Sequence, residues 1–121
     1  MEKVPKRRTK YTRTGYQSPI EVALEVIGGK YKPVILYELR RGPQRYSDLR
    51  RAVKSATQKM LTQHLRELEQ DGLVERRVFP QVPPRVQYCL TPLGKSLQPA
   101  LEALCKWGTK RLQLLGTRPD A

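Results

Sequence analysis

The clearest helical pattern of hydrophobic and polar positions lies in the middle of the chain. Three leucines recur there at four- and three-residue steps, which places them on one face of an α-helix: Leu61, Leu65 and Leu68. Thr57 precedes the pattern as an N-cap, and Gly72 follows it as a residue that accepts a left-handed backbone. The sequence therefore predicts a capped amphipathic helix that ends at about Asp71.

Two further helices are predicted upstream. The first begins with the capping-box sequence at Ser18, carries Ile20, Ala23, Leu24 and Ile27 on its apolar positions, and ends at Gly28. The second begins near Lys32, buries Val34, Ile35, Leu36 and Leu39, and ends before Gly42 and Pro43. Arg45 and Tyr46 then form at most an isolated strand, and Ser47 is expected to cap a short helix.

A β-hairpin is predicted after Gly72. Residues 73–79 form one strand, the prolines at 83 and 84 mark the turn, and residues 85–90 form the second strand. Val86, Tyr88 and Leu90 alternate with more polar residues, which predicts a half-buried strand. Thr91 then opens a region with leucines at 93, 97, 101 and 104, which Pro99 is expected to kink or break.

Composition narrows the function. The 121 residues hold 24 Lys and Arg against 11 Asp and Glu, a net charge of +13, which favours a polyanionic partner. A length of this size predicts one domain. No apolar run approaches the roughly 18 residues of a membrane span, and the basic start has no apolar segment of a secretory signal. Residues 1–17 are basic and poor in aliphatic residues, so we expect a flexible arm, acting either on DNA or as a solubilising tail.

The predicted central helix carries a second face suited to DNA. It holds donors and acceptors and no acidic residue: Gln58, Lys59, Thr62, Gln63 and Arg66. Gln58, Lys59, Thr62 and Gln63 are the candidates for base edges, whereas Thr57 and Arg66 are candidates for phosphate contacts. Any exposed helix has a polar face, so the prediction depends on the neighbouring short helix and hairpin.

The predicted hairpin adds three arginines. Arg85 lies nearest the Pro-Pro turn and is the best candidate for a minor groove, where the negative potential is enhanced. Arg76 and Arg77 either contact the DNA backbone or protect an edge strand against aggregation. His64 lies at the edge of the apolar face and is expected to be partly buried rather than to read bases.

The first and last helices offer more apolar surface than a small domain buries alone. We therefore expect a homodimer through these helices, with the interface residues Ile20, Leu24, Leu97, Leu101, Leu104 and Trp107. The alternative is that these leucines pack within one protomer.

Three segments together resemble HxlR-type transcriptional regulators, which are bacterial winged helix-turn-helix proteins related to the MarR group. They are SPIEVALEVIGGKYKPVILYEL, YSDLRRAV, and TQKMLTQHLRELEQDGLVERRVFPQVPPRVQYCLTPLGKSLQPALEALCKWG. The resemblance covers residues 18–108. It implies a mainly α fold with a small β-hairpin (α+β), a homodimer, a recognition helix over residues 58–71 and a wing over residues 74–90. It also implies binding to near-palindromic promoter DNA.

The sequence departs from that family in three places. Ser18 stands where many members carry a cysteine, and a hydroxyl cannot form the thiolate that thiol sensing needs. His64 stands where Gln is usual, and the basic arm at 1–17 is outside the shared pattern. Cys89 and Cys105 have no metal-ligand spacing and are expected in or near a core.

Three functions compete at this point. The first is a dimeric, sequence-specific transcriptional regulator, located in the cytoplasm at the nucleoid. Its winged-helix DNA-binding domain spans residues 18–108, and a helical extension or tail follows at 109–121. The second is a sequence-tolerant, architectural nucleic-acid-binding protein. The third, an enzyme, lacks a nucleophile–base pair or paired acids. The sequence indicates no cofactor and no metal, and it leaves a small-molecule effector open.

Overall fold

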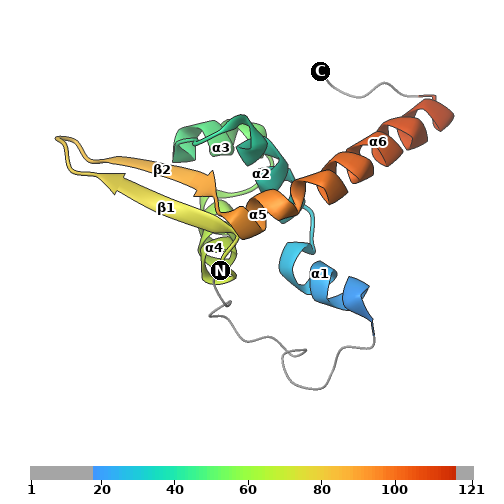
Figure 1. The fold of residues 1–121 in the computed structure, drawn as a ribbon. Coiled ribbons are helices and arrows are strands. Elements are labelled where there is room, and N and C mark those ends of the chain that lie inside the picture. The colour runs from blue at the N-terminus through green and yellow to red at the C-terminus, as the bar shows by residue number, and fades with distance from the viewer. Residues whose placement is uncertain (1–17, 117–121) are drawn as a thin grey trace.

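The computed structural model describes residues 18–116, so the predicted arm at 1–17 and the last five residues lie outside the described part. The elements in chain order are α1 (Pro19–Ile27), α2 (Lys32–Glu38), the 3₁₀-helix η1 (Leu39–Arg41), α3 (Tyr46–Ala52), α4 (Gln58–Gln70), β1 (Val74–Phe79), β2 (Arg85–Leu90), α5 (Pro92–Ser96) and α6 (Gln98–Leu114). Figure 1 shows the hairpin and α6 extending in opposite directions from a body of short helices. This is the predicted winged helix-turn-helix architecture.

The start of α1 confirms half of the predicted capping box. The Glu21 carboxylate accepts the backbone N–H of Ser18 at 3.1 Å, and the Glu21 N–H donates to the Ser18 carbonyl at 3.1 Å. The helix ends at Gly28, as predicted. Ile27 is the buried residue of α1, and the other residues of this helix stay partly or fully exposed.

The second helix follows the prediction with one exception. Ile35, Leu36 and Leu39 are buried, and Gly42 ends the segment with a φ of 118°. Val34 was expected in the core, but it is 43% exposed. The prediction was wrong because Ile35 and Leu36 of α2, with Leu39 of η1, already form the side that faces the core.

The segment before α3 differs from the sequence prediction. Gln44, rather than Arg45 and Tyr46, pairs with a strand: its N–H and carbonyl bond Tyr88 at 2.9 and 2.8 Å. Tyr46 is already helical, and Ser47 is not the cap. The Asp48 carboxylate instead accepts the Arg45 N–H at 2.9 Å, which starts the helix earlier.

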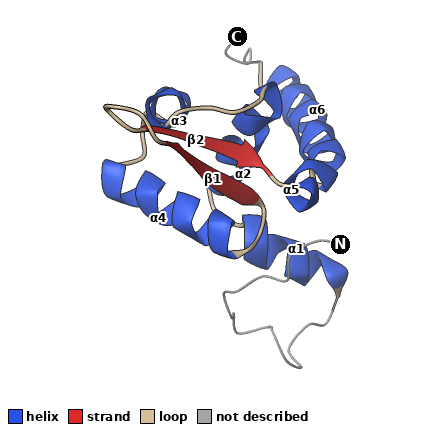
Figure 2. Ribbon diagram, turned by 60° about the vertical axis from the view of Figure 1, so that its left-hand side comes forward, coloured by secondary structure: helices blue, strands red, loops and turns tan. Residues whose placement is uncertain are grey.

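The central helix and the hairpin form where predicted. The Thr57 hydroxyl accepts the Met60 N–H at 3.0 Å, and Gly72 follows α4 with a φ of 80°. Strand β1 pairs with β2 in antiparallel register from Val74 opposite Leu90 to Phe79 opposite Arg85. The expected alternation of buried and exposed residues along β2 is absent, because α4 packs against β1 while η1, α3 and α5 pack against β2 (Figure 2).

The core lies where α2, α3, α4 and the base of the hairpin meet. It is made of aliphatic residues from all four: Ile35, Leu36, Leu39, Leu49, Val53, Leu61, Leu65, Leu68, Leu73, Val74 and Leu90. Leu101 of α6 joins it, so the start of α6 is anchored to the body. None of the helices within residues 18–116 has both the length and the apolar character needed to cross a bilayer.

The predicted break at Pro99 is confirmed. α5 ends at Ser96, Leu97 joins the two helices, and α6 begins at Gln98 with Pro99 in its first turn, where a missing N–H costs nothing. The turn before α5 is tightly bonded: the Thr91 hydroxyl donates to the Gly72 carbonyl at 2.5 Å and accepts the Gly94 N–H at 3.1 Å.

Gly94 is the glycine at which a methyl group should be most damaging. A Cβ there would overlap the Leu73 carbonyl oxygen and press on the Leu90 side chain. We expect Gly94→Ala to lower the free energy of unfolding by about 2 kcal/mol, as overpacking does. Gly108→Ala is the matched control, because a Cβ there meets nothing and alanine should raise helix stability by about 0.5–1 kcal/mol. Urea unfolding of both variants measures this, and equal effects would contradict the packing argument.

Candidate nucleic-acid interface

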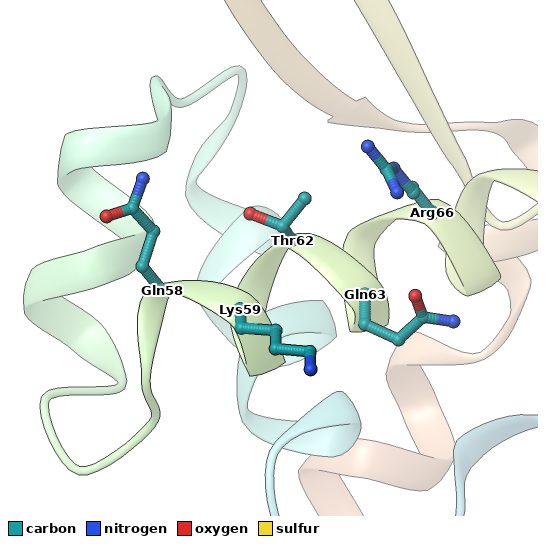
Figure 3. A pocket seen from close by; sticks show the side chains of 5 residues that line it. All are labelled: Gln58, Lys59, Thr62, Gln63 and Arg66. Atoms are coloured by element: carbon teal, nitrogen blue, oxygen red, sulfur yellow. The ribbon is translucent and has the colours of Figure 1, made fainter.

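The outer face of α4 presents the five predicted side chains together. Gln58, Lys59, Gln63 and Arg66 are exposed and Thr62 is half-buried. They line a shallow, open hollow of about 490 Å³ along the helix (Figure 3). The first turn of α4 holds no acidic residue, so the positive end of the helix dipole is not neutralised there.

The opposite face of α4 fixes the orientation of this hollow. Leu61, Leu65 and Leu68 are completely or almost completely buried. A helix held by three buried leucines cannot rotate about its axis without exposing them, so the polar face is a fixed feature of the fold.

Tyr46 of α3 contacts the beginning of the polar face, which sequence reasoning missed. Its hydroxyl donates to the Gln58 carbonyl at 3.2 Å and lies 3.4 Å from the Thr62 hydroxyl. The tyrosine therefore fixes the first turn of α4 against α3. Only the folded arrangement brings these residues together, because they are 12 and 16 positions apart.

A buried ion pair joins α4 to α2. The Lys32 ammonium is 2.8 Å from the Glu67 carboxylate, and Lys32 is only 7% exposed. Glu67 also accepts the Gln63 amide at 3.4 Å, so the ion pair borders the polar face. The sequence pattern indicates Lys32 only as the start of a helix, and no local pattern identifies its partner.

His64 is half-buried, as predicted. Its Nδ1 lies 3.8 Å from the Glu67 carboxylate, and its ring packs against Tyr31 with the centroids 6.0 Å apart. No group of three metal-ligating side chains occurs among the described residues. Thr57 uses its oxygen as the helix cap, which leaves the hydroxyl proton able to donate outward.

The hairpin arginines lie on two different faces. Arg76 lies opposite Tyr88 and shares a hollow of about 360 Å³ with Thr62 and Arg66 of α4. Arg77 and Arg85 alternate to the other face, where Arg77 lies 3.5 Å from Glu75 and the Arg85 guanidinium stacks 4.5 Å from the Phe79 ring centroid. Arg76 thus extends the α4 face directly, whereas Arg77 does not line that hollow.

The expected dimer residues divide into two groups. Ile20, Leu24, Leu104 and Trp107 are exposed, the tryptophan to 66%. Leu101 is 4% exposed and Leu97 packs against the core, so these two support α6 within the protomer. Leu114 and Leu115 are also exposed and extend the apolar surface beyond the residues named from the sequence.

The two cysteines have different surroundings. Cys89 is buried, in agreement with the sequence prediction, but Cys105 is exposed on α6, where that prediction was wrong for a single protomer. A hydrogen bond with the Cys105 thiol, together with burial, raises the pKa of Tyr37, and the charge of Arg40 opposes the shift. Both thiols are free.

Residues 26–115 match the model of the HxlR-like helix-turn-helix family, which covers most of the chain. The chain belongs to this family. This agrees with the resemblance inferred from the sequence motifs, and the family is one of transcriptional regulators of the helix-turn-helix type rather than of enzymes.

Two curated relatives of this HxlR-like protein are close in sequence. The HTH-type transcriptional regulator YkvN of Bacillus subtilis is 57% identical over 88 residues, which are 73% of this chain and 75% of YkvN. An HTH-type transcriptional regulator of Methanothermobacter thermautotrophicus is 53% identical over 93 residues, 77% of this chain and 71% of that protein.

A solved structure shows the same fold. The redox regulator HypR in its reduced form superimposes with a TM-score of 0.77 at 45% identity and covers 82% of this chain and 98% of HypR.

Proposed function

We propose that this HxlR-like protein is a sequence-specific transcriptional regulator that binds a near-palindromic promoter site as a homodimer. The observation that carries the proposal is the exposed face of α4, which combines amide and cationic side chains with a helix start that lacks acidic residues. Such a helix end attracts phosphate and presents its first turns to base edges in a major groove.

The side chains divide by chemistry. The Gln58 and Gln63 amides can each donate and accept on an adenine edge, and Lys59 can donate to guanine. Arg66 and Arg76 lie around one hollow where α4 meets the hairpin, which suits a phosphate between them. Arg77 and Arg85 lie on the other face of the hairpin. Arg85 follows the Pro-Pro tip directly, so a tip that reaches a minor groove carries the Arg85 guanidinium with it.

The exposed apolar side chains of α1 and α6 support the homodimer. Ile20, Leu24, Leu104 and Trp107 are large apolar side chains that are each more than half exposed in the protomer, and such surface usually marks an interface. A two-fold dimer would place the two α4 helices about one DNA turn apart, ~34 Å.

Footprinting on the promoter beside the protein's own gene tests the proposal. We expect a protected pseudo-palindrome bound more than ~10³-fold tighter than random duplex of the same length. The second candidate function, a sequence-tolerant architectural protein, is favoured by the net charge of +13. It predicts uniform protection along the duplex, and that result would replace the regulator with the architectural protein.

Trp107→Glu should break the proposed dimer. A buried interfacial tryptophan commonly contributes more than about 2 kcal/mol, so we expect dimer dissociation to become at least about thirtyfold easier. Because Trp107 is exposed in the protomer, thermal unfolding of the monomer should change little. Val82→Glu, at the fully exposed hairpin tip, is the control. Sedimentation velocity measures the association, and an unchanged dimer in Trp107→Glu would place the interface elsewhere.

A further inference from the structure

A second hollow lies on the side of the hairpin away from α4. We call it the basic pocket and define it by Arg40, Arg41, Arg77, Cys89, Lys95 and Glu102, which line it together with apolar residues. Its walls come from three places: the η1 turn, the hairpin and the α5–α6 junction. It shares no lining residue with the hollow on the outer face of α4.

The charges of the basic pocket are only partly balanced. Arg41 lies 3.6 Å from Glu38 and Arg77 lies 3.5 Å from Glu75. Lys95 makes no ion pair within residues 18–116. Arg40 is not paired with a carboxylate in this part of the chain either, and it is held in place by the Tyr37 ring at 3.9 Å and the Tyr37 carbonyl at 3.1 Å. Arg40 and Lys95 therefore face one cavity without an ion-pair partner among the described residues, and the four cations of its lining outnumber its single carboxylate, Glu102.

The volume and the lining of the basic pocket limit the class of ligand that it can bind. The volume is about 510 Å³, within the range of small-molecule sites. Leu39, Pro43 and Leu90 add apolar walls, and the thiol of Cys89, a residue that is 6% exposed, forms part of the lining. An inorganic ion would leave the apolar walls uncovered, whereas an organic anion with a compact apolar body would cover them and pair the cations.

We propose that the basic pocket binds a small organic anion, with a carboxylate or phosphate held by Arg40 and Lys95 and an apolar body against Leu39 and Leu90. Its walls join the hairpin to the helix that carries Trp107, so an occupied pocket restrains these two elements relative to each other. If the proposed function holds, occupancy changes the affinity for the operator, and the operator changes the affinity for the anion by the same factor.

Titration calorimetry at constant ionic strength tests binding with three probes. Benzoate carries the anionic group and the apolar body, benzamide has the same shape without charge, and inorganic phosphate has charge without the body. We expect the full chain to bind benzoate and to bind benzamide and phosphate at least about tenfold more weakly. Equal binding of benzoate and benzamide, or binding of phosphate alone, would overturn the proposal.

The double variant Arg40→Gln/Lys95→Gln locates the site. It should weaken benzoate binding at least about tenfold, because it removes two charge-assisted hydrogen bonds. Lys54→Gln/Lys110→Gln removes the same charge from exposed positions outside the basic pocket and should leave the benzoate affinity unchanged. Equal weakening in both variants would show a general charge effect and overturn the proposal.

Protection of Cys89 provides a measurement that does not depend on those substitutions. In Cys105→Ser, Cys89 is the single remaining cysteine, and benzoate should slow its reaction with a small thiol reagent while benzamide should not. Unchanged reactivity at saturating benzoate would overturn the proposal.

Competition between benzoate and a random DNA duplex tests whether the basic pocket binds a free anion or a phosphate of DNA. If the duplex displaces no benzoate from the chain, the basic pocket serves a free anion. If the duplex binds through Arg40 and Lys95 and benzoate does not bind, the pocket is a DNA-phosphate contact and the proposal is wrong. Loss of operator binding without loss of benzoate binding would count against the proposed function alone, so the two failures are distinguishable.

Discussion

Lys59→Ala/Gln63→Ala should abolish most of the preference of this protein for its operator. Both side chains are exposed, lie one turn apart and line the hollow on α4 (Figure 3). Each good base contact contributes about 1–3 kcal/mol of discrimination, so removing two should lower the ratio of operator to random-duplex affinity by about thirtyfold or more. Competition binding at fixed salt, with each single variant alongside, measures this ratio.

The control for that experiment removes the same residue types from outside the polar face. Lys54 precedes α4 and Gln70 is its last residue, both exposed, so Lys54→Ala/Gln70→Ala loses the same charge and the same amide. It should weaken binding to all sequences alike and leave the affinity ratio within about threefold, because lost phosphate attraction carries no sequence information. A ratio that falls equally in both double variants would remove α4 from the role of reading bases.

The elements of this fold that could be predicted are those determined by neighbours in sequence. Thr57 and Gly72 mark the start and the end of α4 as expected, because a capping hydroxyl and a residue with positive φ act within one turn. Pro99 separates α5 from α6 for an equally local reason, the missing N–H. The same local reasoning gave a wrong start at Ser47, because Arg45 is the N-cap of α3 and the Asp48 carboxylate accepts its N–H.

Contacts between distant residues could not be predicted. Leu101 and Leu104 stand one turn apart on α6 and follow one apolar pattern, but only Leu101 has core residues next to it. Alternation predicts that Arg76 and Arg77 face opposite sides of the hairpin, but not that one side meets α4 and the other forms the basic pocket. A periodic pattern indicates which residues share a face and leaves open what covers that face.

The Lys32–Glu67 ion pair should be the most costly polar contact to break. Glu67→Ala leaves the Lys32 ammonium buried without its carboxylate, a situation that typically costs 3–5 kcal/mol. We expect about 3 kcal/mol in the free energy of unfolding, the lower end, because the Glu67 side chain is 24% exposed and water can approach the site. Urea unfolding of the variant and the parent chain measures the difference.

Two further variants separate the loss of the ion pair from the other effects of Glu67→Ala. Glu69→Ala removes an exposed carboxylate from the same helix and should change stability by less than about 0.5 kcal/mol. Lys32→Met/Glu67→Ala removes both charges and should recover much of the loss, because no unpaired ammonium stays buried. If the double variant is as unstable as Glu67→Ala, the unpaired ammonium is not the source of the loss, and Glu67 stabilises α4 through its other contacts.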